Sequence, residues 1–337
     1  MRNRYNFTLS LIIVFMFFPA LLFSGNSVNL TNKGSKNKNI IIISDTQDPL
    51  WIERLFLESN NNEKGREILF TNILKSQPDA VFHLGDLVSL GYSGDSWHAI
   101  DNWMQQLSKL EIPFYPTLGN HELMIFSELG EENFKIRFPF YSKTGYMRQI
   151  GPLAFILLNS NISYLSSSEI SKQQDWYKSK LTECDSDTSI KVIIVGCHHP
   201  PFTNSKVVSP NEDVQDDFVP GFIQSKKSVL FLSGHSHSFE HFNYAGKDFM
   251  TIGGGGGLQH PLEAEEESEY KDLFNSPDNE RNFHYLHCSI SEQKIAISVQ
   301  MLVEDFTGLK TVYELEQTYP QSHFVQIEKI PLPIQKD

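Results

Sequence analysis

Six short apolar runs, separated by helical or polar segments, constrain the fold of this chain more than any other feature of its sequence. Each run is short enough for a buried strand. Alternation of such strands with helices predicts a mainly parallel β-sheet with helices on its faces. Ser166 and Glu169 predict a capping box at the start of one helix. The predicted strands are Asn39–Ser44, Ala80–Leu84, Ile112–Thr117, Leu153–Leu158, Lys191–Gly196 and Val229–Ser233, and another helix is predicted from the apolar spacing of Trp97, Ile100, Met104 and Leu107.

The last third of the chain contains apolar runs without long helices between them. We expect these runs to form a second, more antiparallel sheet of the same domain. The sequence therefore predicts one domain over residues 39–303 and a C-terminal tail over residues 304–337, to which it assigns no role. The runs are His241–Tyr244, Phe249–Ile252, His284–Ile290 and Ile295–Val303.

The first residues have the pattern of a secretory signal peptide. Arg2 and Arg4 precede an apolar run over residues 7–23, and small residues follow it. This layout predicts a signal peptide over residues 1–25, cut near residues 24–27, and a polar linker over residues 26–38. We expect an exported protein, either periplasmic or secreted. The alternative is an uncleaved membrane anchor, because the run approaches the roughly 18–20 residues that span a bilayer.

The charge of the chain argues against a nucleic acid polymer as a partner. The formal net charge is −13, and loss of Arg2 and Arg4 with the signal peptide would leave −15. Proteins that bind DNA or RNA need basic faces that displace counterions. A small anionic substrate remains compatible with this charge if cations dominate locally. Three cysteines are too few for a disulfide framework, although one bridge is possible.

Polar residues with metal-ligand chemistry follow five of the predicted strands. In open α/β sheets, ligands bind at the carboxyl ends of the strands, so we expect these side chains to lie close together. Any one of them alone could be an ordinary turn residue, but the five in order are a strong signal. The segments are Asp45-Thr46-Gln47, Gly85-Asp86, Gly119-Asn120-His121-Glu122, His198-His199-Pro200 and Gly234-His235-Ser236-His237.

The number and kind of donors indicate two metal ions. Two Asp, one Gln, one Asn and three His exceed the three or four protein ligands of a mononuclear zinc site. Mixed oxygen and imidazole donors suit Mn, Fe or Zn better than Ca or Mg. Paired metals roughly 3.5–4 Å apart can clamp the attacking and leaving oxygens of a displacement at phosphorus.

The order Asp-x-Gln, Gly-Asp, Gly-Asn-His-Glu, His-x-Pro and Gly-His-x-His resembles the calcineurin-like metallophosphoesterase superfamily, over roughly residues 39–300. The resemblance implies an α/β fold, a four-layer αββα sandwich of two mixed β-sheets. It also implies a bridging role for Asp86 between two divalent or transition metal ions. One ion would take Asp45, Gln47, Asp86 and His237, and the other would take Asp86, Asn120, His198 and His235.

The same resemblance implies a binuclear hydrolase of small phosphodiesters or phosphomonoesters that uses a metal-bridging hydroxide. His121 would donate a proton to the leaving oxygen, and Asn120 would stabilise charge on the substrate. Two residues depart from related patterns. Family members often have His at the position of Gln47, which leaves the first metal open, and purple acid phosphatases have Tyr at the position of Ser89.

Several alternatives remain open on the sequence. The rival function is a non-catalytic metal-binding scaffold of the same fold. His199 could exchange roles with His198, although the His-x-Pro spacing favours His198. His260 follows a glycine run and could touch the substrate. We expect a hydrogen-bonded core histidine at His83 and a surface strand residue at His241.

Overall fold

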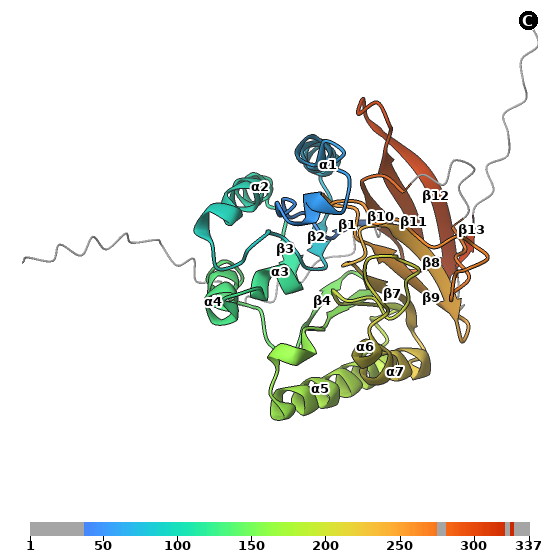
Figure 1. Cartoon of the computed structure of the whole chain (residues 1–337). Helices are drawn as coiled ribbons and strands as arrows, with labels where there is room; N and C mark the ends of the chain where they lie inside the picture. Colours follow the sequence, from blue (N-terminus) through green and yellow to red (C-terminus); the bar gives the residue numbers. More distant parts are fainter. Residues whose placement is uncertain (1–36, 275–280, 321–323, 327–337) are drawn as a thin grey trace, which may run out of the picture. The chain divides into compact units, whose positions relative to one another are not determined.

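The computed structural model describes residues 37–274, 281–320 and 324–326. The predicted signal peptide, residues 26–36 of the predicted linker and the last residues of the predicted tail lie outside these ranges. Among the described residues, no helix is both long and apolar enough to cross a membrane. The ranges contain two mixed β-sheets with helices on their outer faces (Figure 1).

The seven-stranded sheet has the strand order β13-β12-β11-β10-β1-β2-β3. Strands β1, β2 and β3 are parallel, whereas β10 pairs with β1 in the antiparallel sense and continues into an antiparallel set. The strands are β1 (Lys38–Ile43), β2 (Ala80–His83), β3 (Phe114–Pro116), β10 (His284–Ile290), β11 (Lys294–Leu302), β12 (Leu309–Thr318) and β13 (Val325–Gln326).

The six-stranded sheet has the order β4-β5-β6-β7-β9-β8. Its central strands β5, β6, β7 and β9 are parallel, and the edge strands β4 and β8 are antiparallel to their neighbours. The strands are β4 (Tyr146–Ile150), β5 (Leu153–Leu157), β6 (Val192–Gly196), β7 (Ser228–Ser233), β8 (Phe239–Tyr244) and β9 (Lys247–Ile252).

Alternate residues of the central strands face two separate cores. In β6, Val192 and Ile194 belong to the core between the sheets, whereas Ile193 and Val195 belong to the core beneath the helices of the other face. This is the two-residue period of a strand that is buried on both faces. Between the sheets, the Phe82 ring of β2 stacks on a ring of β5 with centroids 4.1 Å apart. Apolar packing therefore stabilises both the contact between the two sheets and the contact between the second sheet and its helices.

Helices complete the outer layers and two of them confirm the sequence predictions. Helix α5 begins after the predicted Ser166–Glu169 capping box, and α2 buries Ile100 and Leu107. In Figure 1, α1 and α2 lie beside β1–β3, and α5, α6 and α7 lie on the opposite side. The helices are α1 (Asn62–Ser76), α2 (His98–Lys109), α3 (Asn120–Leu123), α4 (Ser127–Arg137), α5 (Ser167–Ser186), α6 (Glu212–Asp217) and α7 (Val219–Gln224), with 3-10 turns η1 (Glu53–Leu55), η2 (Gly94–Trp97) and η3 (Ile162–Tyr164).

The two-sheet prediction is confirmed, but the expected assignment of strands to sheets is wrong. The six N-terminal strands do not share one sheet, because β1–β3 lie in one sheet and β5–β7 in the other. The C-terminal strands also divide, since β8 and β9 join the second sheet and β10 and β11 join the first. Strands β2, β5, β6 and β7 are buried on both faces, and the alternating pattern of β11 fits an edge region of either sheet. The strand sequences therefore do not indicate which sheet each strand enters. The first sheet also extends past residue 303, because β12 pairs along β11.

Candidate metal centre

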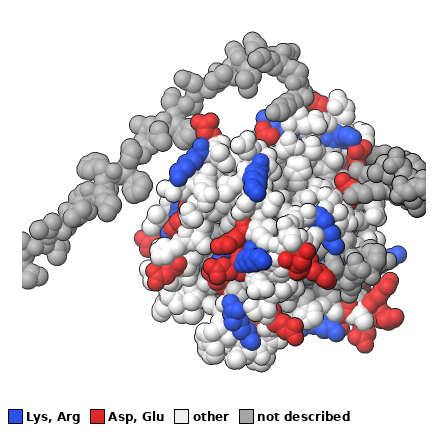
Figure 2. Space-filling model, turned by 90° about the horizontal axis from the view of Figure 1, so that it is seen from above, with Lys and Arg blue, Asp and Glu red and all other residues white. Residues whose placement is uncertain are grey.

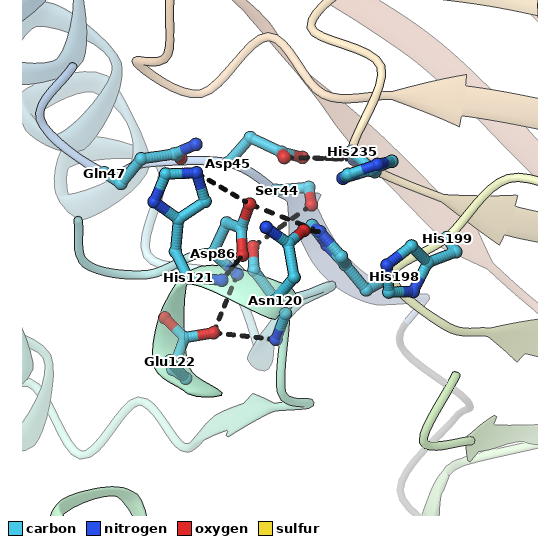
Figure 3. A network of polar contacts seen from close by, with 12 residues as sticks. Ser44, Asp45, Gln47, Asp86, Asn120, His121, Glu122, His198, His199 and His235 are labelled. Atoms are coloured by element: carbon cyan, nitrogen blue, oxygen red, sulfur yellow. Dashed lines mark hydrogen bonds and ion pairs between the residues drawn. The ribbon is translucent and has the colours of Figure 1, made fainter. Parts of the chain in front are cut away.

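The sequence-predicted ligands all lie where strands end, and both sheets contribute to the same edge. Asp45 follows β1, Asp86 follows β2, and Asn120 begins helix α3 directly after β3 and its short loop. From the second sheet, His198 follows β6, and His235 and His237 follow β7. Figure 3 shows the side chains of this set other than His237 pointing toward one another from the two sheets.

Asp86, Asn120 and His198 form the closest cluster. The His198 Nε2 atom lies 3.2 Å from Asp86 Oδ2 and 3.0 Å from Asn120 Oδ1. His198 and Asp86 are almost fully buried. Ligand atoms of Asp45, Asp86 and His198 lie within 4.8 Å of one another, as do those of His198, His199 and His235. The structure thus brings Asp86 between donors of both predicted ligand sets.

The second group of donors gathers around Asp45. His237 Nε2 lies 3.5 Å from Asp45 Oδ1 and 3.2 Å from Gln47 Nε2. The backbone N–H of His235 donates to both carboxylate oxygens of Asp45, at 3.0 Å each. The Gln47 side-chain oxygen is buried and has no hydrogen-bond partner. Because buried polar atoms are nearly always satisfied, this oxygen marks the place of a missing positive partner, and it fits a metal ion.

Backbone carbonyls fix the orientation of two histidine rings. The Nδ1 atom of His198 lies 3.0 Å from the carbonyl oxygen of Leu84, and Nδ1 of His237 lies 2.6 Å from that of Leu258. Each Nδ1 must carry the proton to donate to a carbonyl, so in the neutral ring Nε2 is left as the free ligand atom. Metal-binding histidines commonly have such partners, which fix the tautomer and the direction of the ring.

The electrostatics suit cation binding. Burial acts to raise the pKa of Asp86, but the adjacent His198 and His121 outweigh it and hold that pKa below its ordinary value. Burial acts to lower the pKa of His198, but Asp86 raises it to about 9. Burial and the neighbouring His198 lower the pKa of His235 well below its ordinary value, which keeps this ring neutral. Anionic Asp86 and neutral His235 are in the forms that bind metals, whereas a metal at His198 would displace the proton that the Asp86 carboxylate holds there.

Three of the candidate ligands have left-handed backbone conformations. The φ angles are +58° at Asp45, +55° at Asp86 and +64° at His235. Residues other than glycine rarely adopt this region, at a cost of order 1–3 kcal/mol each, and such residues cluster at functional sites. Here the turn directly after each strand aims the side chain at the common centre.

His121 lies beside the centre rather than within it. Its Nδ1 atom lies 2.9 Å from the Ser89 carbonyl oxygen, and its backbone N–H donates to Asp86 Oδ1 at 2.8 Å. The free Nε2 atom lies 3.9 Å from Asp86 Oδ2 and 3.8 Å from Glu53 Oε1. His121 also lines an open cleft of ≈ 520 Å³ that borders His237. A group in the cleft could therefore reach Nε2.

Glu122 is a supporting residue that the sequence analysis did not identify. Its buried carboxylate accepts four backbone N–H groups: those of Asp86 at 3.0 Å, Gly119 at 2.7 Å, Leu87 at 2.7 Å and Val88 at 3.1 Å. Burial and the Asp86 carboxylate raise the pKa of Glu122 to about 7. Glu122 thus ties the turn after β2 to the turn before α3 (Figure 3).

The glycine run Gly253–Gly257 is part of the wall of the centre. All five glycines of this run, which precedes His260, are buried. The N–H of Gly257 donates to the Asp45 carbonyl at 3.0 Å, and a Cβ atom at Gly257 would lie 2.3 Å from the His237 ring. The Asn62 side chain donates to the carbonyl oxygens of Gly256 and Gly257, at 3.0 and 2.8 Å. The absence of side chains lets this segment pass directly behind the ligands.

The other histidines divide between core and cleft. His83 is a hydrogen-bonded core residue, as predicted, with Nε2 2.9 Å from Thr46 Oγ1. His199 lies 2.9 Å from Ser160 Oγ through Nδ1, with its ring beside His235. His260 stacks on His237 with centroids 4.3 Å apart and lines the cleft.

The prediction for His241 is wrong. This side chain is 3% exposed and lies between the sheets, with Nε2 3.0 Å from Asp248 of β9 and Nδ1 3.0 Å from Tyr313 of β12. The sequence could not show that β12 covers this face of β8.

A family model for calcineurin-like phosphoesterases matches residues 38–239, which is more than half of the chain and includes every candidate metal ligand. The chain belongs to this family. Members typically bind divalent metals, and the two candidate ligand clusters of this structure agree with that property. No curated protein sequence matches the chain.

Solved structures support the fold at low sequence identity. A purple acid phosphatase from yellow lupin seeds has a TM-score of 0.59 at 14% identity, with 85% of this chain and 54% of that one covered. This chain thus spans about half the length of the lupin protein. GAP50, described as the anchor in the inner membrane complex of Plasmodium, has a TM-score of 0.60 at 14% identity, with coverages of 87% and 90%. A dimetal phosphatase from Danio rerio has a TM-score of 0.50 at 15% identity, with coverages of 84% and 99%.

Proposed function

We propose that the protein is a binuclear metal-dependent hydrolase of small phosphate esters. The observation that carries the proposal is the convergence of Asp86, Asn120 and His198 within hydrogen-bond distance, with the free Nε2 of His121 beside them. A family of phosphoesterases with this donor set needs metals for its chemistry, and the unpartnered oxygen of Gln47 is consistent with one.

Two divalent or transition metal ions would be held by the residues that converge at the strand ends. When bound, such ions lower the pKa of water and neutralise charge on phosphoryl oxygens. The donor chemistry favours Mn, Fe or Zn. We propose Asp45, Gln47, Asp86 and His237 as one ligand set and Asp86, Asn120, His198 and His235 as the other.

His121 is proposed as the proton donor. During hydrolysis, the oxygen of a water molecule bonds to phosphorus, the ester P–O bond breaks, and the leaving oxygen takes a proton. Nε2 of His121 lies at the cleft, while the proton on Nδ1 is held by the Ser89 carbonyl. The imidazolium form of His121 therefore delivers its second proton from Nε2 and returns to the neutral ring. The Asn120 side chain also lies at the centre, where its amide can stabilise charge on the phosphoryl oxygens.

The charge distribution supports a small substrate. The net charge is −13, and Figure 2 shows Lys and Arg side chains scattered among acidic ones on the face drawn, without a continuous basic band on its described part. Long DNA or RNA would therefore gain little from counterion release. A phosphodiester is proposed slightly ahead of a monoester, on the resemblance of the His198-His199-Pro200-Pro201 segment to that of bacterial cyclic-nucleotide and glycerophosphodiester enzymes.

The N-terminal residues support a proposal on location. The basic start and apolar run over residues 7–23 favour export with cleavage near residues 24–27, or anchoring to a membrane if the segment stays uncut. N-terminal sequencing of the protein from its native cell decides between them. A chain that begins at Met1 and remains in the cytoplasm contradicts both.

A non-catalytic scaffold is the second candidate function. One solved structure of similar fold is described as an anchor, which shows that this fold also serves other roles. The presence of the complete donor set and of His121 favours the enzyme.

The test of the proposed function is a substrate panel at equal metal loading. The purified protein with Mn²⁺ is given bis-nitrophenyl phosphate, nitrophenyl phosphate and a single-stranded oligonucleotide. We expect turnover of at least one small ester and little cleavage of the oligonucleotide. Stoichiometric metal binding without turnover of any ester would favour the scaffold, and fast oligonucleotide cleavage would contradict the small-substrate proposal.

A further inference from the structure

The segment after β1 exposes an unusual number of large apolar side chains beside the centre. Trp51, Ile52, Leu55 and Phe56 are 74%, 49%, 66% and 82% exposed. Surface loops that connect elements are usually polar, and contiguous exposed apolar side chains commonly mark a binding surface. The position of this segment, directly after the Asp45 and Gln47 turn, places it next to the metal ligands.

Phe56 and Leu57 form one wall of the cleft that contains His121. A second wall segment consists of residues 206–208 with His260 and Pro261. Backbone contacts hold its two parts together, since Lys206 N–H donates to the Pro261 carbonyl at 2.9 Å and Ser205 forms a β-bridge with Leu262. The cleft therefore has apolar side chains in the same lining as His121 and His237.

The charges of the cleft do not suit a second anionic group. Lys206 is the single Lys or Arg among the described lining residues, and its Nζ atom lies 3.4 Å from Glu263 Oε2. Glu53 lines the same cleft near His121. A substrate with further phosphates would meet one paired cation and an acidic side chain, whereas an uncharged hydrocarbon group would meet Phe56, Val207 and Val208.

We propose that this cleft binds an apolar leaving group, so that the substrate is a small phosphate ester of an alkyl or aryl alcohol. The proposal rests on the proposed function, because it places the phosphoryl group at the metal centre and the leaving oxygen near Nε2 of His121. The hydrocarbon then lies between Phe56 and the wall of Val207 and Val208. Both walls lose apolar surface to water when the ester binds.

The first experiment varies only the length of the hydrocarbon. Ethyl, butyl and hexyl phosphates, and their methyl diesters, have leaving alcohols of nearly equal acidity, so differences report binding of the chain. Burial of one methylene is worth a factor of about four in affinity, and in this open cleft we expect kcat/KM to rise roughly two- to fourfold per added carbon. Alkyl phosphonates, whose C–P bond is not hydrolysed, should show the same trend in Kd by calorimetry on the metal-loaded protein.

The second experiment compares two neighbouring side chains. Phe56→Ala should reduce the chain-length factor to less than about twofold per carbon, because one wall is lost. Leu55→Ala is the matched control, since Leu55 is also highly exposed on the same segment but does not line the cleft, and its chain-length factor should remain that of the wild type. Both side chains are exposed, so neither change should prevent folding.

The outcomes separate the two proposals. If no ester is hydrolysed but phosphonate affinity rises with chain length, the apolar cleft stands and the proposed function fails. Hydrolysis that does not depend on chain length, or an equal factor in Phe56→Ala and Leu55→Ala, overturns the apolar cleft. A lipid surface is the other possible ligand of these side chains. If the wild-type protein sediments with phosphatidylcholine vesicles, both variants lose this sedimentation, and no chain-length effect is seen, the side chains bind lipid and the apolar-cleft proposal is overturned.

Discussion

Glu122→Gln is the most informative single change, because it keeps the shape of the side chain and alters only its hydrogen bonding. The Glu122 carboxylate accepts N–H groups from Asp86 and Gly119 through Oε2 and from Leu87 and Val88 through Oε1. A Gln side chain has one acceptor oxygen, so two of the four buried N–H groups would face an NH₂ group instead. A buried group without its partner costs about 1–3 kcal/mol, or about 2–6 kcal/mol for two. The substitution also removes a buried anion whose pKa is raised to about 7, which returns up to about 3 kcal/mol at pH 8, so we expect a net loss of roughly 1–3 kcal/mol. That is a large part of the stability of a typical domain.

The assay is urea denaturation at pH 8, above the pKa of about 7, where the carboxylate is ionised. Metal content is measured on the same samples, because the Asp86 and Gly119 turns that carry the candidate ligands should also shift. Glu67→Gln on the exposed side of α1 is the control, with an expected change within about 0.5 kcal/mol. A loss below about 1 kcal/mol in Glu122→Gln, with unchanged metal content, would show that the four contacts do not hold the site together.

Four further substitutions test other parts of the structure. Asp86→Asn should remove most activity and lower the amount of bound metal, whereas His83→Ala should chiefly reduce the free energy of unfolding. Two full metal equivalents with normal turnover in Asp86→Asn would refute a bridging role for Asp86. His121→Ala should retain metal and slow turnover about 10²–10⁴-fold, less for acidic leaving groups, and an equal loss for nitrophenyl and alkyl esters would argue against a proton donor. Burial raises the pKa of Glu240 from 4.5 to about 7. Between pH 4.5 and pH 7 the folded protein therefore keeps a proton on Glu240 that the unfolded chain loses. The free energy of unfolding should fall as the pH rises through this range, by up to about 3 kcal/mol. Glu240→Gln should reduce the slope of urea stability against pH without removing it, because the pKa of Glu122 is raised to a similar value. An unchanged slope would contradict this cause.

The sequence predicted the positions of the candidate ligands well because strand ends are a local property. Each apolar run ends within a residue or two of its predicted limit, and three of the polar residues that follow the runs, Asp45, Asp86 and His198, meet at one edge. Parallel strands place their carboxyl ends together whatever their order in the sheet. The error in assigning strands to sheets therefore did not affect the prediction of the site.

The parts that the sequence did not predict depend on contacts between distant elements. His241 was expected on the surface, but Tyr313, 72 residues later, covers it from the other sheet. Glu122 ends a recognisable motif, yet its role comes from the N–H groups of a turn 34–36 residues earlier. The apolar segment around Phe56 carries no motif, and only its place beside His121 gives it meaning.

The division of the candidate ligands between the two sheets links metal binding to folding of the whole domain. Asp45, Asp86 and Asn120 belong to the first sheet, and His198 and His235 belong to the second, so the N–H bond from His235 to Asp45 joins residues 190 positions apart. Contacts between residues so far apart in the sequence slow the folding of a domain. An ion that bridges the sheets acts as a reversible cross-link whose strength is set by the free metal concentration. If the proposed metals bind, a chelator would lower the stability of the contact between the two sheets rather than that of one local turn.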